Sequence, residues 1–203
     1  MVMKVLKCIL ITLGLTFSFV ANAKPEVDSL FRQANDPVAG NPKGKVTIVE
    51  FFDYNCSHCV SMAHTLDAII KSNPNVRVVF KEYPIRGPMS EIAARAALAA
   101  NKQGKYYQFS HALITSHYSI NENNLTDIAK DAGINISEWK KDINSKTVKS
   151  QIYSNYKLAR ELEITGTPAL FIGKTNTTKS SEMKFILGEV NQAELQDYIN
   201  QFS

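Results

Sequence analysis

One stretch of this chain limits its possible folds more than any other, the apolar run Val46–Phe52. Its β-branched and aromatic residues follow one another almost without interruption, which is typical of a strand buried on both faces of a sheet. Residues 57–72 then place apolar side chains at helical spacing, and a second strand-like run covers 76–83. Asn73-Pro74 ends the helical pattern, because a residue before proline disfavours the helical conformation. This order predicts a βαβ unit with a right-handed crossover.

A helical segment and a second pair of strands follow. Apolar residues recur at helical spacing from 88 to 161, and short strands are predicted at 169–172 and 183–187, before a closing helix. Two strands joined by a turn-rich loop indicate an antiparallel hairpin. The whole order, βαβ, helices and ββα, predicts an α/β fold in which 45–87 and 162–203 form one domain around an all-helical insertion.

The helical insertion offers little chemistry of its own. It contains no paired carboxylates, no glycine-rich loop and no evident cluster of ligands. We interpret Trp139 and the tyrosines of this segment as packing residues, and His111 and His117 as ordinary members of the insertion.

The first 23 residues have the pattern of a secretory signal peptide. Two lysines give a positive start, residues 9–20 are mostly apolar, and Ala21-Asn22-Ala23 has the small-x-small form of a cleavage site. The apolar run is well short of the ~20 residues that cross a bilayer, which disfavours a membrane anchor. We expect cleavage after Ala23, loss of Cys8 with the peptide, and a lead-in at 24–44 before the main domain.

The mature chain is nearly neutral. Removal of Lys4 and Lys7 lowers the formal net charge from +4 to +2. The remaining basic residues are scattered, and Lys140-Lys141 is their only adjacent pair. A nucleic-acid-binding surface therefore has little support.

Only two cysteines remain in the mature chain, within the tetrapeptide Cys56-Ser57-His58-Cys59. A secreted protein held together by disulfides would have a larger set of cysteines. A bridge that closes so short a loop constrains the unfolded chain weakly, so stability is a poor reason for this pair. The tetrapeptide therefore indicates chemistry rather than cross-linking.

Cys56 falls where the first strand gives way to a helix. A helix N-terminus presents unpaired N–H groups and a positive dipole end, which favours the reactive thiolate. Cys59 lies one turn further on the same face, within reach for a disulfide. A protonated His58 would add positive charge, and the Ser57 hydroxyl could donate a hydrogen bond to the thiolate. Stabilisation by ~2–4 pKa units would make the disulfide more oxidising by about 60–120 mV.

The alternative interpretation of a Cys-x-x-Cys motif is half of a zinc site. Zinc needs about two further ligands, usually a second close pair. The remaining histidines are His64, His111 and His117, and the last two are six residues apart in a helical stretch, so they do not share a face. We therefore expect no metal and no other cofactor.

Glu50 is a carboxylate in a strand that we expect to be buried. Such a position is unfavourable unless the carboxylate has a partner or a function. We interpret Glu50 as a proton acceptor for the buried Cys59 thiol, and a frayed or edge-facing strand residue is the alternative. Lys81, on the neighbouring strand, is a possible partner for Glu50.

Pro168 stands at the start of a predicted core strand, although proline cannot donate a hydrogen bond to the sheet. A cis bond between Thr167 and Pro168 would resolve this conflict. Only ~5% of such bonds are cis in folded proteins, so the residues alone leave the isomer open.

The segment from Val49 to Cys59, with Gly-Thr-Pro168-Ala far downstream, resembles the DsbA-like family of periplasmic thiol oxidoreductases. The resemblance covers essentially the whole mature chain and implies a thioredoxin fold with a helical insertion. It also implies that Cys56 is the nucleophile, that Pro168 is cis and lies against the disulfide, and that Glu50 is a buried acid. The dipeptide between the cysteines is Ser-His here, whereas Pro-His is the commonest in these oxidases, and the redox strength depends on this difference.

The expected activity is donation of the Cys56–Cys59 disulfide to cysteine-containing, unfolded secreted proteins in the periplasm, with Thr167 and Pro168 binding the substrate. The resemblance implies a membrane partner that reoxidises the pair. An isomerase or reductase is one alternative, since a fold does not fix the direction of exchange. A non-redox, chaperone-like peptide-binding module is another. The lead-in at 24–44 is short for a dimerisation arm, which favours a monomer.

Overall fold

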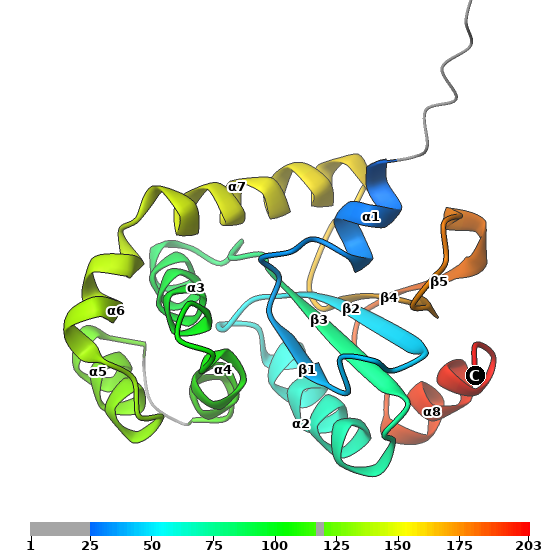
Figure 1. Cartoon of the computed structure of the whole chain (residues 1–203), viewed down its shortest axis with the longest axis horizontal. Coiled ribbons are helices and arrows are strands. Elements are labelled where there is room, and N and C mark those ends of the chain that lie inside the picture. Colours follow the sequence, from blue (N-terminus) through cyan, green and yellow to red (C-terminus); the bar gives the residue numbers. More distant parts are fainter. Residues whose placement is uncertain (1–24, 117–119) are drawn as a thin grey trace, which may run out of the picture.

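The computed structural model describes residues 25–116 and 120–203, and a five-stranded sheet lies at its centre (Figure 1). The predicted signal peptide, residues 1–23, lies outside the described residues. The strands are β1 (Val38–Gly40), β2 (Val46–Phe52), β3 (Val76–Glu82), β4 (Ala169–Lys174) and β5 (Met183–Leu187). The helices are α1 (Pro25–Phe31), α2 (Ser57–Ser72), α3 (Pro88–Asn101), α4 (Tyr106–Thr115), α5 (Glu122–Asp131), α6 (Ile136–Ile143), α7 (Lys146–Glu161) and α8 (Gln192–Asn200), with a 3-10 turn, η1 (Ser180–Glu182).

The sheet order is β1-β3-β2-β4-β5. β2 pairs in parallel with β3 and antiparallel with β4, while β1 and β5 pair antiparallel at the two edges. The parallel pair is connected through α2, and β4 and β5 form the predicted hairpin, so both of these predictions are confirmed. Every residue of β2 is buried, which confirms that this strand is covered on both faces.

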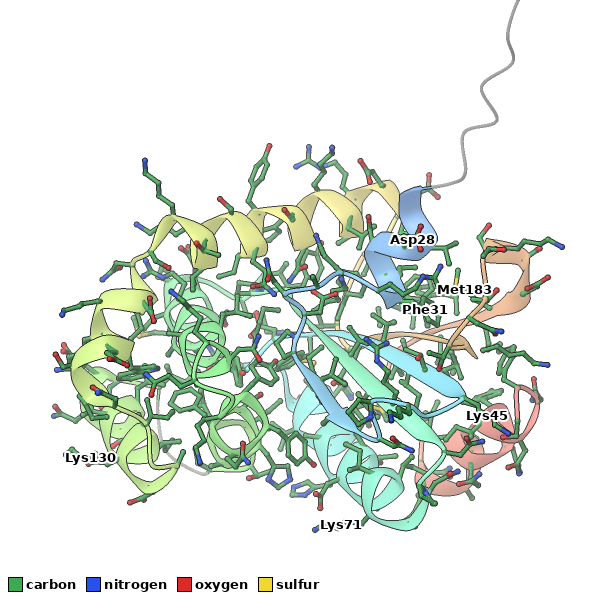
Figure 2. All side chains as sticks on the ribbon, in the orientation of Figure 1. Asp28, Phe31, Lys45, Lys71, Lys130 and Met183 are labelled. Atoms are coloured by element: carbon green, nitrogen blue, oxygen red, sulfur yellow. The ribbon has the colours of Figure 1, made fainter. Side chains whose placement is uncertain are left out.

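Helices cover both faces of the sheet. α2 and α8 pack on one face, and α1 and α7 pack on the other (Figure 1). Side chains fill the space between these layers (Figure 2). Ile48 and Phe52 belong to the core cluster on the α2 face, and Val49 and Phe51 belong to the cluster on the α1 face. This division follows from the strand itself, because successive side chains point to opposite faces.

Residues 88–161 contain the helices α3 to α7. α3 is rich in buried alanines and packs against α4, α6 and α7. Trp139 of α6 is buried against Phe109, and its indole Nε1 donates to the carbonyl oxygen of Ala96 at 2.8 Å, so its predicted packing role is confirmed. Across the described residues, none of the helices combines the length and the apolar character that a bilayer crossing requires.

The lead-in contains two elements that the sequence did not predict, α1 and β1. α1 buries Leu30 and Phe31 against the sheet, and Figure 2 shows Phe31 close to Met183 at the β5 edge. β1 has only three residues and extends the sheet beside β3. So short a strand has no periodicity that a sequence pattern could reveal.

Lys81 does not pair with Glu50, so that prediction was wrong. The register of β2 and β3 places Phe80 opposite Glu50 and Lys81 opposite Phe51, which puts Lys81 on the α1 face. There its ammonium group forms a buried ion pair with Asp36. Burial raises the pKa of Asp36 to about 6 and lowers the pKa of Lys81, while their mutual attraction opposes both shifts.

Replacing Asp36 with Asn removes the only charged partner that Lys81 contacts in the described residues. Loss of one member of a buried ion pair typically costs about 3–5 kcal/mol. The Lys81 ammonium keeps its hydrogen bond to the carbonyl oxygen of Ser29, so we expect the lower end, about 3 kcal/mol of the free energy of unfolding. Urea denaturation at pH 7 measures this loss.

The matched control is Asp28→Asn, which breaks the exposed ion pair between Asp28 and Arg32. Exposed pairs contribute less than about 1 kcal/mol. Equal, small losses for the two variants would mean that the Asp36–Lys81 pair does not anchor the lead-in to the sheet.

Candidate active site

The two cysteines lie at the start of α2, one turn apart. Cys56 immediately precedes the helix, and the N–H groups of Cys59 and Val60 donate to its carbonyl oxygen at 3.0 and 3.1 Å. Both thiols are free and both residues are buried, whereas Ser57 and His58 between them are exposed. The end of β2 and the first turn of α2 therefore hold the two sulfurs just beneath the surface.

The loop before β4 closes against Cys56. The Cys56 thiol donates to the carbonyl oxygen of Thr167 at 3.3 Å, and the Thr167–Pro168 bond is cis, which confirms the isomer that the family resemblance implied. β4 pairs with β2 from its first residue, so the preceding loop is carried to the end of β2. The N–H of Gly188 donates to the carbonyl oxygen of Pro168 at 2.8 Å and ties this loop to the hairpin.

The pKa of the Cys56 thiol is lowered. Burial alone would raise it, because desolvation disfavours the thiolate. Hydrogen bonds from Cys59, contacts with Thr167 and the positive charge of Arg86 outweigh burial. The backbone N–H of Arg86 donates to the buried carboxylate of Asp53 at 2.8 Å, which fixes this segment next to the cysteines.

His58 contacts a residue that the sequence analysis did not identify, Glu189. The imidazole Nδ1 lies 3.2 Å from Oε1 of Glu189, and the His58 side chain is 64% exposed. Hydrogen bonding with His58 lowers the pKa of Glu189. We predicted that a protonated His58 would stabilise the Cys56 thiolate. The Glu189 carboxylate, from the β5–α8 connection, carries a negative charge beside His58 and reduces that stabilisation.

Glu50 and Cys59 both belong to the buried α2 side of the sheet. Glu50 is 2% exposed in the central strand, which excludes the frayed or edge-facing alternative. Burial raises its pKa to about 8, and the charges of Glu82 and Cys56 add to this effect. Burial also raises the pKa of the Cys59 thiol far above its usual range, with the charge of Glu50 as the next cause.

A second buried carboxylate, Glu82, escaped the sequence analysis. The hydroxyl groups of Tyr54 and Tyr106 donate to its Oε1 at 3.0 and 2.7 Å, and the Tyr54 hydroxyl also shares a hydrogen bond with Ser110 at 2.8 Å. Burial raises the pKa of Glu82 to about 8 even though both tyrosines favour the ionised form. Glu82 follows Lys81 at the end of β3, so the signal that marked Glu50, a lone carboxylate between apolar residues, is weaker there.

The structure thus brings Cys56, Cys59, Thr167 and Pro168 together at one end of the sheet. Glu50 is buried in β2, the strand that ends there, and the His58 side chain is exposed. Within 25–116 and 120–203, no three His, Cys, Asp or Glu side chains are arranged to hold a metal ion. The arrangement is a dithiol with one acidic sulfur and one strongly basic sulfur. Once oxidised to a disulfide, such a pair can exchange with a substrate thiolate, and the acidic sulfur is the better leaving group of the two.

The raised pKa values of Glu50 and Glu82 predict a pH-dependent stability. Both carboxylates ionise near pH 4.5 when unperturbed and near pH 8 in the fold. The folded state therefore binds more protons than the unfolded state between these values, and the free energy of unfolding falls as the pH rises from about 4.5 to about 8.

Urea denaturation of the reduced protein across this range measures the slope. Glu82→Gln cannot ionise and should lose less stability on going from pH 5 to pH 8. The matched control Glu161→Gln, on the exposed surface of α7, should keep the slope of the unaltered protein. A slope unaffected by Glu82→Gln would contradict the raised pKa of this group.

Comparisons with known proteins agree with this geometry. A family model described as a DSBA-like thioredoxin domain matches residues 47–200. The thiol:disulfide interchange protein DsbA of Burkholderia cepacia is 27% identical over 186 residues, with 86% of each chain covered. The probable disulfide bond formation protein D of Bacillus cereus is 24% identical over 178 residues, which cover 81% of this chain and 82% of that protein. The chain also matches the Na(+)/H(+) antiporter NhaA 1 of Mycolicibacterium gilvum, at 26% identity over 142 residues, but this match spans 68% of this chain and only 23% of the antiporter.

Two solved structures share the whole architecture. A thioredoxin-like oxidoreductase from Silicibacter pomeroyi is 38% identical with a TM-score of 0.77, covering 86% of this chain and 95% of that one. The thiol-disulfide exchange protein alpha-DsbA2 from Wolbachia pipientis is 26% identical with a TM-score of 0.77, covering 89% and 96%. These likenesses confirm the predicted thioredoxin fold. The paired thiols, the cis-proline loop and the family match together show that this chain belongs to the DsbA-like family of thiol–disulfide oxidoreductases.

Proposed function

We propose that this protein is a periplasmic oxidase that donates a Cys56–Cys59 disulfide to unfolded secreted proteins. The observation that carries the proposal is the unequal pair of sulfurs, with a lowered pKa at Cys56 and a raised pKa at Cys59. A stabilised Cys56 thiolate favours the reduced pair, so the disulfide is given up readily. The same thiolate is a good leaving group in the second step of exchange.

The reaction proceeds through a mixed disulfide. A substrate thiolate attacks Cys56 Sγ, the Cys56–Cys59 bond breaks, and Cys59 leaves as a thiolate. A second substrate thiolate then attacks the substrate sulfur of the mixed disulfide and displaces Cys56. The substrate loses two electrons and gains a disulfide, and the protein ends as the dithiol. DsbA-like proteins are generally reoxidised by a membrane partner, and we propose the same for this protein.

Glu50 supplies the proton that the departing Cys59 needs. Because the pKa of the Cys59 thiol is strongly raised, the released thiolate takes up a proton at neutral pH. The Glu50 carboxyl group is buried on the same side and keeps its own proton to about pH 8. In the reverse direction, the Glu50 carboxylate accepts the proton of Cys59.

Exposed apolar side chains on the two segments that adjoin the site suit an unfolded substrate. Ile85 and Met89 are 41% and 43% exposed on either side of Arg86, whose charge acts on Cys56. Leu187 is 53% exposed and lies opposite Ala169, next to the cis-proline. We propose that an extended peptide binds along the backbone of Thr167 as an added strand.

The first prediction for this mechanism concerns the two sulfurs. In Cys59→Ala, the Cys56 thiolate can attack a disulfide of a substrate, which releases one substrate thiolate and leaves a mixed disulfide that no second protein thiol resolves, so substrate adducts should accumulate. Cys56→Ala should accumulate none, because Cys59 is buried and strongly basic. Non-reducing gels of cells that express each variant measure the adducts. A non-redox peptide-binding module would show none in either variant.

Glu189→Gln should make the protein more oxidising. It removes a negative charge that lies 3.2 Å from the His58 imidazole, two residues from Cys56, and so favours the Cys56 thiolate. The pair is exposed and screened, so we expect a rise of about 10–30 mV, where about 30 mV corresponds to a tenfold change in the equilibrium constant. Equilibration with glutathione measures the potential, with Glu161→Gln as the distant control. An unchanged or lower potential would mean that the Glu189 charge does not act on the Cys56 thiolate.

The direction of exchange is tested in cells. Alkylation with a mass-shifting reagent traps free thiols, and we expect Cys56 and Cys59 to be recovered mainly as the disulfide in the unaltered protein. The carboxylate of Glu189 beside His58 lowers the expected redox potential. Recovery of Cys56 and Cys59 mostly as free thiols would overturn the oxidase assignment in favour of an isomerase or a reductase.

A further inference from the structure

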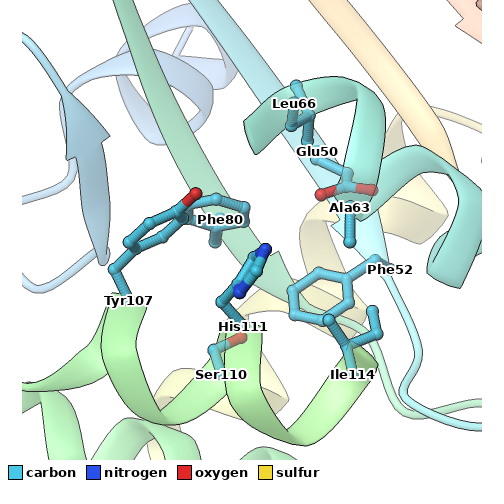
Figure 3. A pocket seen from close by; sticks show the side chains of 9 residues that line it. All are labelled: Glu50, Phe52, Ala63, Leu66, Phe80, Tyr107, Ser110, His111 and Ile114. Carbon is cyan, nitrogen blue, oxygen red and sulfur yellow. The ribbon is translucent and has the colours of Figure 1, made fainter. Parts of the chain in front are cut away.

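A small cavity lies where β2, α2 and α4 meet. It offers about 20 Å³ to the centre of a water molecule, which suffices for one water. Glu50, Ser110 and His111 contribute polar groups to its lining, and Phe52 and Ala63 are among its apolar residues. Figure 3 shows the carboxylate of Glu50 from β2 and the imidazole of His111 from α4 directed toward this shared space.

Two buried polar atoms of this cavity lack a hydrogen-bond partner in the described part of the chain, Oε1 of Glu50 and Nε2 of His111. Buried polar atoms are rarely left unpaired, and an ordered water with two to four polar neighbours commonly satisfies them. Here the two atoms and the Ser110 hydroxyl line one space of the right size. A single bridging water would satisfy both orphaned atoms together.

Glu50 needs such a connection if it exchanges protons with Cys59. It is 2% exposed and belongs to the fully buried strand β2, so its own contact with solvent is minimal. The His111 side chain, by contrast, is 31% exposed, although its buried Nε2 lies 3.8 Å from the carboxylate of Asp67, beyond hydrogen-bond distance. His111 therefore reaches from the cavity to the solvent.

The other titratable groups around the cavity offer no competing exit. Glu82 on β3 is 1% exposed and is enclosed by the hydroxyl groups of Tyr54 and Tyr106. On α4, the Tyr107 hydroxyl donates to Asp67 at 2.9 Å, and burial raises the pKa of this tyrosine beyond the neutral range. At the start of α2, the charge of Cys56 acts on Glu50, and the charge of Glu50 acts on Cys59.

We propose that a water in this cavity links the Glu50 carboxyl group to the His111 imidazole, and that His111 is the solvent end of the proton path to Cys59. When Cys59 leaves as a thiolate, Glu50 gives it a proton and becomes a carboxylate. The bridging water passes a proton from His111 to Glu50, and His111 regains a proton from solvent. This path rests on the disulfide exchange proposed above.

His111→Ala removes the solvent end of the path. Quenched-flow mixing of the oxidised protein with a cysteine peptide at pH 7 should show exchange slowed at least about 10-fold, below the ~10²–10⁴-fold typical of a direct acid or base. Added imidazole should restore the rate in proportion to its concentration, which a purely structural role of His111 would not produce. His64→Ala is the matched control, because His64 is an exposed histidine of α2 outside the cavity lining.

His111→Gln is the second variant, since it keeps a polar side chain that cannot titrate, and it should also be slow. Unaltered rates in folded His111 variants, with Glu50→Gln slow, would overturn the path and leave the proposed function intact. No exchange by the unaltered protein would overturn both. If neither His111 variant folds, a high-resolution crystal structure of the unaltered protein decides. A water bound to both Glu50 and His111 supports the path, and an empty or dry cavity overturns it.

Discussion

Strand β2 is paired on both edges and covered on both faces, and all seven of its residues are buried. Because the strand is fixed in this way, the turn that follows it places Cys56 at the N-terminus of α2 with little freedom to move. The antiparallel partner β4 begins beside the same end, so Thr167 and Pro168 are brought against the sulfur. Strand β2 therefore positions both the Cys56 thiol and the Thr167 backbone that contacts it.

The same burial controls which ionised groups the core can hold. On the α1 face, Asp36 and Lys81 compensate one another as an ion pair. On the α2 face, Glu50 and Glu82 have no cationic partner in the described residues, and burial raises both pKa values to about 8. An uncompensated buried carboxylate keeps its proton rather than its charge. Glu50 and Glu82 therefore remain protonated in the core at neutral pH, which suits a reaction that releases the strongly basic Cys59 thiolate.

The sequence predicted most of the fold and about half of the site. Continuous apolar runs and helical spacing revealed β2, α2 and β3, and the position of Cys56 at a strand–helix junction followed directly. The partner of Lys81 could not be found in this way, because it depends on the register that sets Lys81 beside Phe51. Glu189 reaches His58 from the far end of the chain through the β4–β5 hairpin, and no local pattern encodes that contact.

The pKa of Cys56 depends on buried contacts and on exposed ones, and these differ in how strongly water and salt weaken them. The groups that lower the pKa of Cys56 include hydrogen bonds from Cys59 and from the Thr167 side chain, and both residues are buried, so salt screens these contacts weakly. The His58–Glu189 pair lies at the surface, where water and salt weaken it. Substitutions in the exposed dipeptide should therefore shift the redox potential modestly around a value set by the buried contacts. The class of chemistry depends on the core, and the redox potential is adjusted at the surface.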